Sequence, residues 1–197
     1  MPAFLEFHDI SKSYPGVKAL QGVSFAVPKG RVHGLIGENG AGKSTLIRIL
    51  SGDAAANTGE IRIDGQVQQY NSTRDAFHAG VAVVHQELQL VPELTVAENL
   101  RLGRFPTSGG VINFRHMFED VGARLRDIGI ATDPCEKVAR LSIGERQMIE
   151  IAKAVMIDAR IIALDEPTSS LSSRESEILF KLIERLKAEG KIILYIS

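Results

Sequence analysis

The feature that most constrains this chain is the stretch Gly37-Glu38-Asn39-Gly40-Ala41-Gly42-Lys43-Ser44-Thr45. It fills every required position of the pattern G-x-x-x-x-G-K-[S/T]. The apolar run Val32–Ile36 before it predicts a buried strand, and the pattern Leu46–Leu50 after it predicts a helix. Glycines in such a loop let consecutive N–H groups face one anion, and the helix start adds the positive end of its dipole. The sequence therefore predicts a phosphate-binding loop, because a chance glycine-rich turn would not fill all these positions.

The loop also predicts the ligand. Lys43 is placed to reach the β- and γ-phosphates of a nucleoside triphosphate, and the Ser44 hydroxyl is placed to hold Mg²⁺. We expect all residues from Gly37 to Thr45 to line the nucleotide site. Tyr14, in a predicted loop between strands at 4–10 and 23–27, is an aromatic that either stacks on the base or only packs, with even weight on each.

Two further strands are predicted to end at the same site. The run Val81–Val84 leads to Gln86, and the run Ile161–Leu164 leads to Asp165 and Glu166. Ligands in parallel α/β sheets bind beyond the carboxyl ends of the strands. Asp165, with Ser44 and Gln86, is therefore a candidate for the metal. Glu166 is a candidate general base for water, and Gln86 a second catalytic residue.

Alternating strands and helices predict a parallel sheet covered by helices. The stretch from residue 90 to 139 looks mostly helical with no obvious strand, and it includes an amphipathic helix from Phe114 to Ile128. We therefore expect core subdomains at 1–89 and 159–197 and an inserted helical subdomain at 90–158. The last run, Ile192–Ile196, is expected to lie at an unprotected sheet edge and to promote self-association.

Bulk composition excludes several other classes of protein. The formal net charge is −1, which gives no field to attract nucleic acid. The single cysteine, Cys135, excludes an internal disulfide. No apolar run approaches the roughly 20 residues needed to cross a bilayer, and the first residues do not form a secretory signal. We expect a cytosolic protein.

Three motifs together resemble one family. They are Asp165-Glu166-Pro167-Thr168, the glutamine Gln86, and Leu141-Ser142-Ile143-Gly144-Glu145. With the phosphate loop, they are similar to the ATP-binding subunits of ABC transporters. The resemblance covers the whole chain and implies a P-loop α/β fold with a parallel-sheet core, an N-terminal antiparallel β subdomain and the inserted helical subdomain. It also implies that Tyr14 stacks on adenine.

Other segments of the sequence resemble one branch of that family more closely, the monosaccharide importers. These segments are Pro15-Gly16-Val17-Lys18-Ala19-Leu20, Val32-His33-Gly34, His85-Gln86-Glu87-Leu88 and Val91 to Asn99. Within the branch, Leu141 to Gly144, Ile161 to Ala163 and Asp165 to Ser172 look most like the ATPases of L-arabinose importers. Ribose, xylose or galactose remains an alternative cargo.

The resemblance also implies partners and a location. Two ATP-binding halves or copies pair head to tail and enclose two ATP molecules, each held by one phosphate loop and by the other partner's signature, Leu141 to Glu145. The pair drives integral-membrane permease subunits, and through them a periplasmic sugar-binding protein, from the cytoplasmic face of the inner membrane. No nucleic-acid partner is implied.

Some residues depart from the family pattern. Ile143 stands where a glycine is usual, Glu145 where a glutamine is usual, and Ser172 where an aspartate is usual. The chain also ends before the usual switch histidine, and branch members carry a second fused half. We expect a truncated first half that binds Mg-ATP and hydrolyses it slowly or not at all.

Other functions are compatible with the phosphate loop. A soluble ABC ATPase of DNA repair or translation would need a coiled-coil insertion or a basic arm, which this chain lacks. A small-molecule kinase gives no reason for Leu141 to Glu145. A regulatory protein that binds nucleotide without hydrolysing it remains open.

Overall fold

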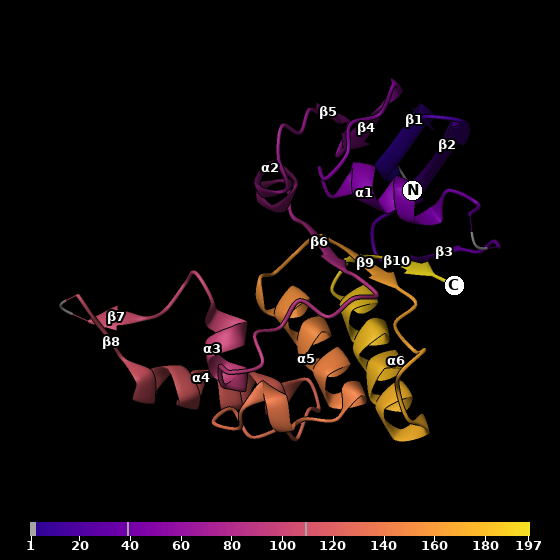
Figure 1. The fold of residues 1–197 in the computed structure, drawn as a ribbon. Helices are drawn as coiled ribbons and strands as arrows, with labels where there is room; N and C mark the ends of the chain where they lie inside the picture. The colour runs from indigo at the N-terminus through magenta and orange to yellow at the C-terminus, as the bar shows by residue number, and fades with distance from the viewer. Residues whose placement is uncertain (1–2, 39, 109) are drawn as a thin grey trace. The chain divides into compact units, whose positions relative to one another are not determined.

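The structure is a computed structural model that describes residues 3–38, 40–108 and 110–197. The chain forms two compact units (Figure 1). The core unit comprises Met1–Val84, Asp158–Glu166 and Ile183–Ser197, and the helical unit comprises His85–Ile157 and Pro167–Leu182. Each unit is described below by itself.

An antiparallel sheet opens the core unit. Its strands are β1 (Ala3–Tyr14), β2 (Val17–Pro28), β4 (Thr58–Ile63) and β5 (Gln66–Gln68), in the order β2-β1-β4-β5. β1 and β2 are longer than the sequence predicted, because they pair along their whole lengths with several register shifts. Tyr14 is therefore not a loop residue. It ends β1 and pairs with Val17 across a tight turn.

A parallel sheet forms the second layer of the core unit. Its strands are β3 (Val32–Leu35), β10 (Ile192–Ile196), β9 (Ile161–Asp165) and β6 (Val81–Val84), in the order β3-β10-β9-β6. β10 pairs with β3 on one side and with β9 on the other. The expectation that this strand lies at an unprotected edge is wrong, so the predicted tendency to aggregate loses its basis.

β3 is an edge strand of that sheet, and this corrects a second expectation. Val32 is 39% exposed, and Ile36, which lies beyond the end of the strand, is 87% exposed. The run Val32–Ile36 is therefore not a fully buried strand. An edge strand has one neighbour, so its apolar pattern alone could not show how far it is covered.

One hydrophobic cluster joins both sheets of the core unit to α1 (Lys43–Leu50) and α2 (Thr73–His78). α1 contributes the buried side chains Leu46, Ile47, Ile49 and Leu50. Each such side chain contributes roughly 1.5–3 kcal/mol when fully buried. This packing fixes α1, and with it the loop that precedes α1, against the sheets.

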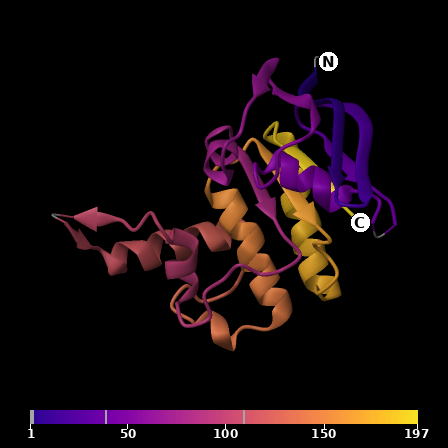
Figure 2. The ribbon, with the colours of Figure 1, turned by 45° about the horizontal axis from the view of Figure 1, so that its top comes forward.

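Before residue 158, the described part of the helical unit holds three α-helices, one 3₁₀ helix and one small hairpin. They are α3 (Val96–Arg101), β7 (Thr107–Ser108), β8 (Val111–Ile112), α4 (Phe114–Asp127), the 3₁₀ helix η1 (Val138–Arg140) and α5 (Ile143–Met156). The hairpin leads directly into α4 (Figure 2). Residues 90–139 therefore include a small hairpin where the sequence shows no obvious strand. Strands of two residues are too short to show an alternating pattern.

Capping explains where the helices of this unit begin. A capping box opens α3, where the Thr95 hydroxyl accepts from the Glu98 N–H and Glu98 accepts from the Thr95 N–H. The bonds from Thr95 hold the pKa of the Glu98 carboxyl below its ordinary value.

The last long helix is α6 (Ser173–Ala188), whose residues up to Leu182 belong to the helical unit and whose later residues belong to the core unit. Among the helices of the described residues, none is long and apolar enough to cross a membrane.

Candidate functional site

The phosphate loop of the core unit has the backbone that its glycines predict. Gly40 and Gly42 have φ angles of +89° and +88°, which residues with a side chain rarely adopt. A Cβ at Gly42 would lie 2.4 Å from the carbonyl oxygen of Ala19 in β2. The loop therefore turns sharply against β2, and only glycine fits there. Asn39 lies outside the described residues.

Lys43 is the first residue of α1 and folds back over the loop. Its Nζ donates to the carbonyl oxygens of Gly37 and Glu38, the latter at 3.2 Å. Both acceptors belong to the loop itself, so the ammonium group is held where the sequence pattern expects phosphate. Ser44 is exposed and Thr45 is half-buried. Both follow Lys43 in the first turn of α1.

Among the residues that the structure describes, no side chain caps the N-terminus of α1. Its N-cap is Gly42, which makes no side-chain capping bond, and its first turn holds no acidic residue. The first N–H groups of a helix lack an intrahelical acceptor and carry the positive end of the helix dipole. An anion is the natural partner for such a terminus.

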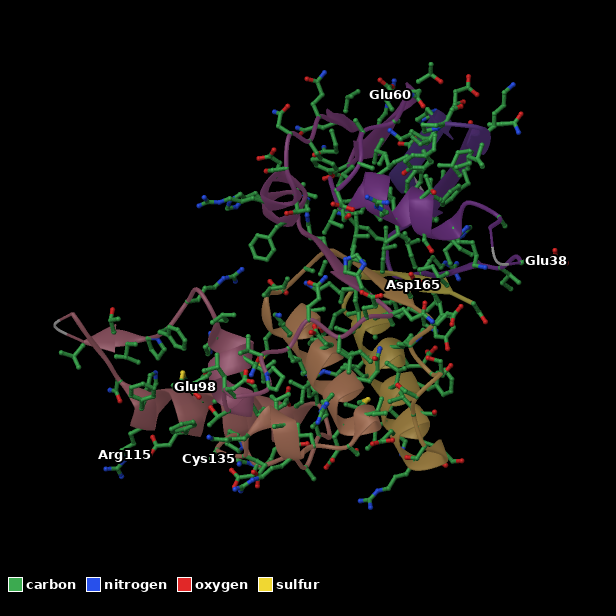
Figure 3. The ribbon with its side chains drawn as sticks, viewed as in Figure 1. Glu38, Glu60, Glu98, Arg115, Cys135 and Asp165 are labelled. Carbon is green, nitrogen blue, oxygen red and sulfur yellow. The ribbon has the colours of Figure 1, made fainter. Side chains whose placement is uncertain are left out.

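Asp165 and Glu166 lie at the carboxyl end of β9 (Figure 3 labels Asp165). Asp165 pairs in register with Ile196 of β10, and Ile196 pairs with Leu35 of β3. The three strands therefore end at one level, and the phosphate loop begins two residues beyond Leu35. The predicted metal and base residues thus leave the sheet at the same edge as the loop.

Glu166 has an unusual backbone. Its φ is +46°, in the left-handed region, and its N–H donates to the carbonyl oxygen of Ile196 at 3.1 Å. A residue other than glycine in this region costs on the order of 1 kcal/mol or more, and such residues gather at functional sites. The hydrogen bond to β10 helps to hold the strained residue directly after the metal candidate.

Tyr14 also belongs to the core unit. Its side chain is 37% exposed, and the Nζ of Lys12 lies 5.4 Å from the centre of its ring. Tyr14 pairs with Val17 at the start of β2, the strand whose Ala19 touches the phosphate loop. Its exposed ring is thus available for stacking.

The remaining predicted residues belong to the helical unit. Gln86 is exposed and lies two residues beyond the end of β6. In the signature segment, Leu141 is buried, Ile143 is 64% exposed and Ser142 caps α5. The Ser142 hydroxyl accepts from the Glu145 N–H at 3.2 Å, and Glu145 accepts from the Ser142 N–H at 2.8 Å. Together these two bonds form a capping box at the start of α5.

Gly144 lies against Glu175, a residue that the sequence does not connect to the signature. A Cβ on Gly144 would lie 2.5–2.8 Å from the carboxyl atoms of Glu175. Glu175 also accepts from the N–H and hydroxyl of Ser172, at 2.8 and 2.7 Å. The sequence shows the Ser172-to-Glu175 spacing of a capping box. It does not show that this carboxylate lies against the signature glycine.

A second missed residue is Glu150, two turns further along α5. It is 9% exposed, and its Oε1 accepts from the N–H of Gln89 at 2.8 Å. The only signal in the sequence is a carboxylate within an otherwise apolar helical stretch.

Comparison with known proteins decides the family. Residues 20–169 match the family model described as "ABC transporter". The chain belongs to the ABC transporter family. This membership confirms the resemblance on which the sequence analysis relied.

Sequence relatives of this ABC transporter chain include one from Rhizobium johnstonii, named "Arabinose import ATP-binding protein AraG". It is 73% identical over 197 residues, which are 100% of this chain and 39% of that protein. A protein of the same name from Ralstonia nicotianae is 55% identical over the same share of each chain. The chain thus spans about two fifths of the length of the relatives it matches.

Solved structures agree with the ABC fold. A nucleotide-free ATP-binding cassette from an ABC transporter superposes with a TM-score of 0.85 at 28% identity, covering 100% of this chain and 81% of that one. A structure described as the ADP conformation of an ATP-binding cassette of an ABC transporter gives a TM-score of 0.84 at 29% identity, covering 100% of this chain and 82% of that one. The predicted P-loop fold, with a parallel sheet, an antiparallel sheet and helices, is confirmed.

Proposed function

We propose that this chain is an ATP-binding part of the subunit that powers monosaccharide import through a membrane permease, with L-arabinose as the cargo. The observation that carries the proposal is 73% identity over the whole chain to a protein named for arabinose import. The soluble ATPases of DNA repair or translation, and ribose, xylose or galactose as cargo, have no support from these relatives.

ATP is the expected nucleotide, and the residues of the core unit fit its phosphates. The uncapped start of α1 supplies N–H donors, Lys43 supplies positive charge, and Gly40 and Gly42 keep the loop backbone open to an anion. Tyr14 would stack on the adenine, a contact that typically contributes about 1–3 kcal/mol.

The site also offers the oxygen ligands that Mg²⁺ prefers. Ser44 and Asp165 would hold the ion, with Gln86 as a further ligand in the nucleotide-bound state. A bound Mg²⁺ neutralises phosphate charge and orients the triphosphate. Glu166 would take a proton from the attacking water while the water oxygen bonds to the γ-phosphorus and the bridging oxygen leaves with ADP.

The helical unit would serve a partner's nucleotide rather than its own. We infer that the signature segment, Leu141 to Glu145, contacts the ATP of a second half or copy in a head-to-tail pair. Gln86 would report the γ-phosphate to the permease. On this proposal residues 90–158 act as the signature subdomain, residues 1–89 and 159–197 act as the nucleotide-binding core, and the subunit lies on the cytoplasmic face of the inner membrane. The periplasmic sugar-binding protein would be an indirect partner.

A variant of Glu166 tests this function in the full-length gene product. Glu166→Gln is expected to leave ATP affinity within about twofold and to lower ATP turnover by about 10²–10⁴, as for loss of a general base. Turnover is measured as phosphate release, together with uptake of labelled L-arabinose by cells that carry the variant. Near-normal phosphate release would assign the base to another residue, and a loss of hydrolysis that leaves arabinose uptake unchanged would refute the cargo.

A further inference from the structure

Glu150 is a buried carboxylate on the signature helix that the proposed mechanism does not use. Among the described residues it is the one carboxylate in the buried class, and its neighbours Ile149 and Ile151 are almost fully buried. Burying a carboxylate is costly unless hydrogen bonds compensate. The bond from the Gln89 N–H, at 2.8 Å, is such a compensation. It joins α5 to the segment that follows Gln86.

Arg146, one turn earlier on α5, is connected to the same segment indirectly, through hydrogen bonds in series. Its Nε and Nη2 donate to the carbonyl oxygens of Val138 and Ala139, at 3.1 and 2.8 Å. The Ala139 N–H in turn donates to the Pro92 carbonyl oxygen at 2.9 Å. α5 therefore holds the chain after Gln86 at two places, one direct and one through η1.

Asn99 of α3 closes the other side of this segment. It is 1% exposed, its Oδ1 accepts from the Val91 N–H at 2.7 Å, and its Nδ2 donates to the Val91 carbonyl oxygen at 3.0 Å. Residues 89 to 94 are thus fixed by buried polar side chains on both sides. Of these contacts, the one made by Glu150 lies nearest in sequence to Gln86.

We propose that Glu150 is a positioning residue that fixes the segment after Gln86 to the signature helix. Gln86 lies three residues before the bonded amide of Gln89, and the signature begins two turns before Glu150 on the same helix. A displacement of the segment that carries Gln86 is therefore transmitted to Ser142–Glu145 through the hydrogen bond between Gln89 and Glu150. Glu150 touches neither nucleotide nor water in this role, which rests on the proposed function of Gln86 and the signature.

Amide hydrogen exchange tests the contact without reference to ATPase activity. Glu150→Leu removes the acceptor, Glu150→Gln keeps one, and Gln89→Pro removes the donor. Asn113→Ala is the matched control, because it removes another side-chain bond to a backbone N–H of the helical unit, that of His116 in α4. Exchange at Gln89 is expected to rise at least about tenfold in Glu150→Leu and to stay near the wild-type rate in Glu150→Gln and in the control. Unchanged exchange in Glu150→Leu would overturn the inference.

ATP hydrolysis by the full-length gene product tests the coupling. Glu150→Leu and Gln89→Pro are each expected to lower kcat about tenfold while KM for ATP changes less than about twofold, and Glu150→Gln is expected to restore most of kcat. A simple loss of folded protein would lower activity in proportion in the Asn113→Ala control as well. Wild-type kcat in both Glu150→Leu and Gln89→Pro would overturn the positioning role. A wild-type protein that hydrolyses no ATP would instead overturn the proposed function, and the exchange arm would still decide the contact.

Discussion

Two helices of this chain begin at segments expected to meet ATP phosphates, and they begin differently. α1 of the core unit starts after Gly42, with no side-chain capping bond and no acidic residue in its first turn. α5 of the helical unit starts at Ser142, with a complete capping box and with Glu145 as the acid in its first turn. One N-terminus is satisfied by its own side chains, whereas the other is not.

This difference predicts which helix start supplies the affinity for ATP and which one contributes when two halves assemble. An N-terminus without a cap gains most from a bound anion, because the ligand supplies the missing acceptors. A self-capped N-terminus that carries a carboxylate already has part of its positive dipole neutralised. We therefore expect the phosphate loop to supply most of the affinity for ATP. The signature is expected to add a weaker contact that matters when two halves meet.

The largest expected effect is loss of nucleotide binding in Lys43→Ala. Lys43 is the one lysine of the loop, and hydrogen bonds between charged partners are about twice as strong as neutral ones. We expect Mg-ATP affinity to fall at least about a hundredfold in a fluorescent-nucleotide titration. Arg62→Ala is the control, because Arg62 pairs with Glu60 in the antiparallel sheet. Equal Mg-ATP affinity in Lys43→Ala and in the wild type would contradict the claim that the phosphate loop binds the nucleotide.

A smaller effect is expected when an acidic residue is placed in α1 at the position that Glu145 occupies in α5. Thr45 occupies the position in α1 that Glu145 occupies in α5, the third residue of the helix. Thr45→Glu should weaken Mg-ATP binding by roughly 30-fold, because two unit charges about 8 Å apart repel by about 2 kcal/mol at an effective dielectric near 20. The same change should raise the free energy of unfolding without nucleotide by about 0.3–1 kcal/mol.

Thr45→Gln is the neutral control for this change, and both properties are measured by titration calorimetry and urea unfolding. If Thr45→Gln weakens binding as much as Thr45→Glu, side-chain size rather than charge would explain the loss. The contrast between the two helix starts would then fail.

The smallest effect is expected at the cap of α5. Ser142→Ala should lower the free energy of unfolding by about 1 kcal/mol, the usual contribution of an N-cap, while the chain keeps its affinity for Mg-ATP. Glu145→Gln should keep both bonds of the capping box and change stability by only a few tenths of a kcal/mol. Urea unfolding and nucleotide titration of the same samples check both points. A matching loss of ATP affinity in Ser142→Ala would show that the signature contributes to binding within one chain.

The sequence predicted local features better than distant contacts. The helix after the glycine loop, the amphipathic helix that begins at Phe114 and the strand before Asp165 follow from residues a few positions apart, and all three are confirmed. The interior place of β10 could not be predicted, because strand order depends on crossovers that leave no mark on a single strand.

The contacts that tie the signature to its surroundings were also missed. Glu175 lies against Gly144, and Glu150 binds the N–H of Gln89, yet each pair is far apart in the sequence. A capping box or a lone carboxylate shows which backbone groups it can satisfy nearby. It does not show which distant segment the fold brings against it.

The most direct test compares the backbone amides of the two helix starts in one titration. Mg-ADP is added to the 197-residue chain, and amide chemical shifts and exchange rates are followed for Gly40 to Thr45 and for Ser142 to Glu145. The account predicts large shifts and slower exchange in the first group at concentrations that leave the second group unchanged. Equal responses of both groups, or a response confined to Ser142–Glu145, would contradict the claim that the uncapped N-terminus of α1 is the nucleotide site of this chain.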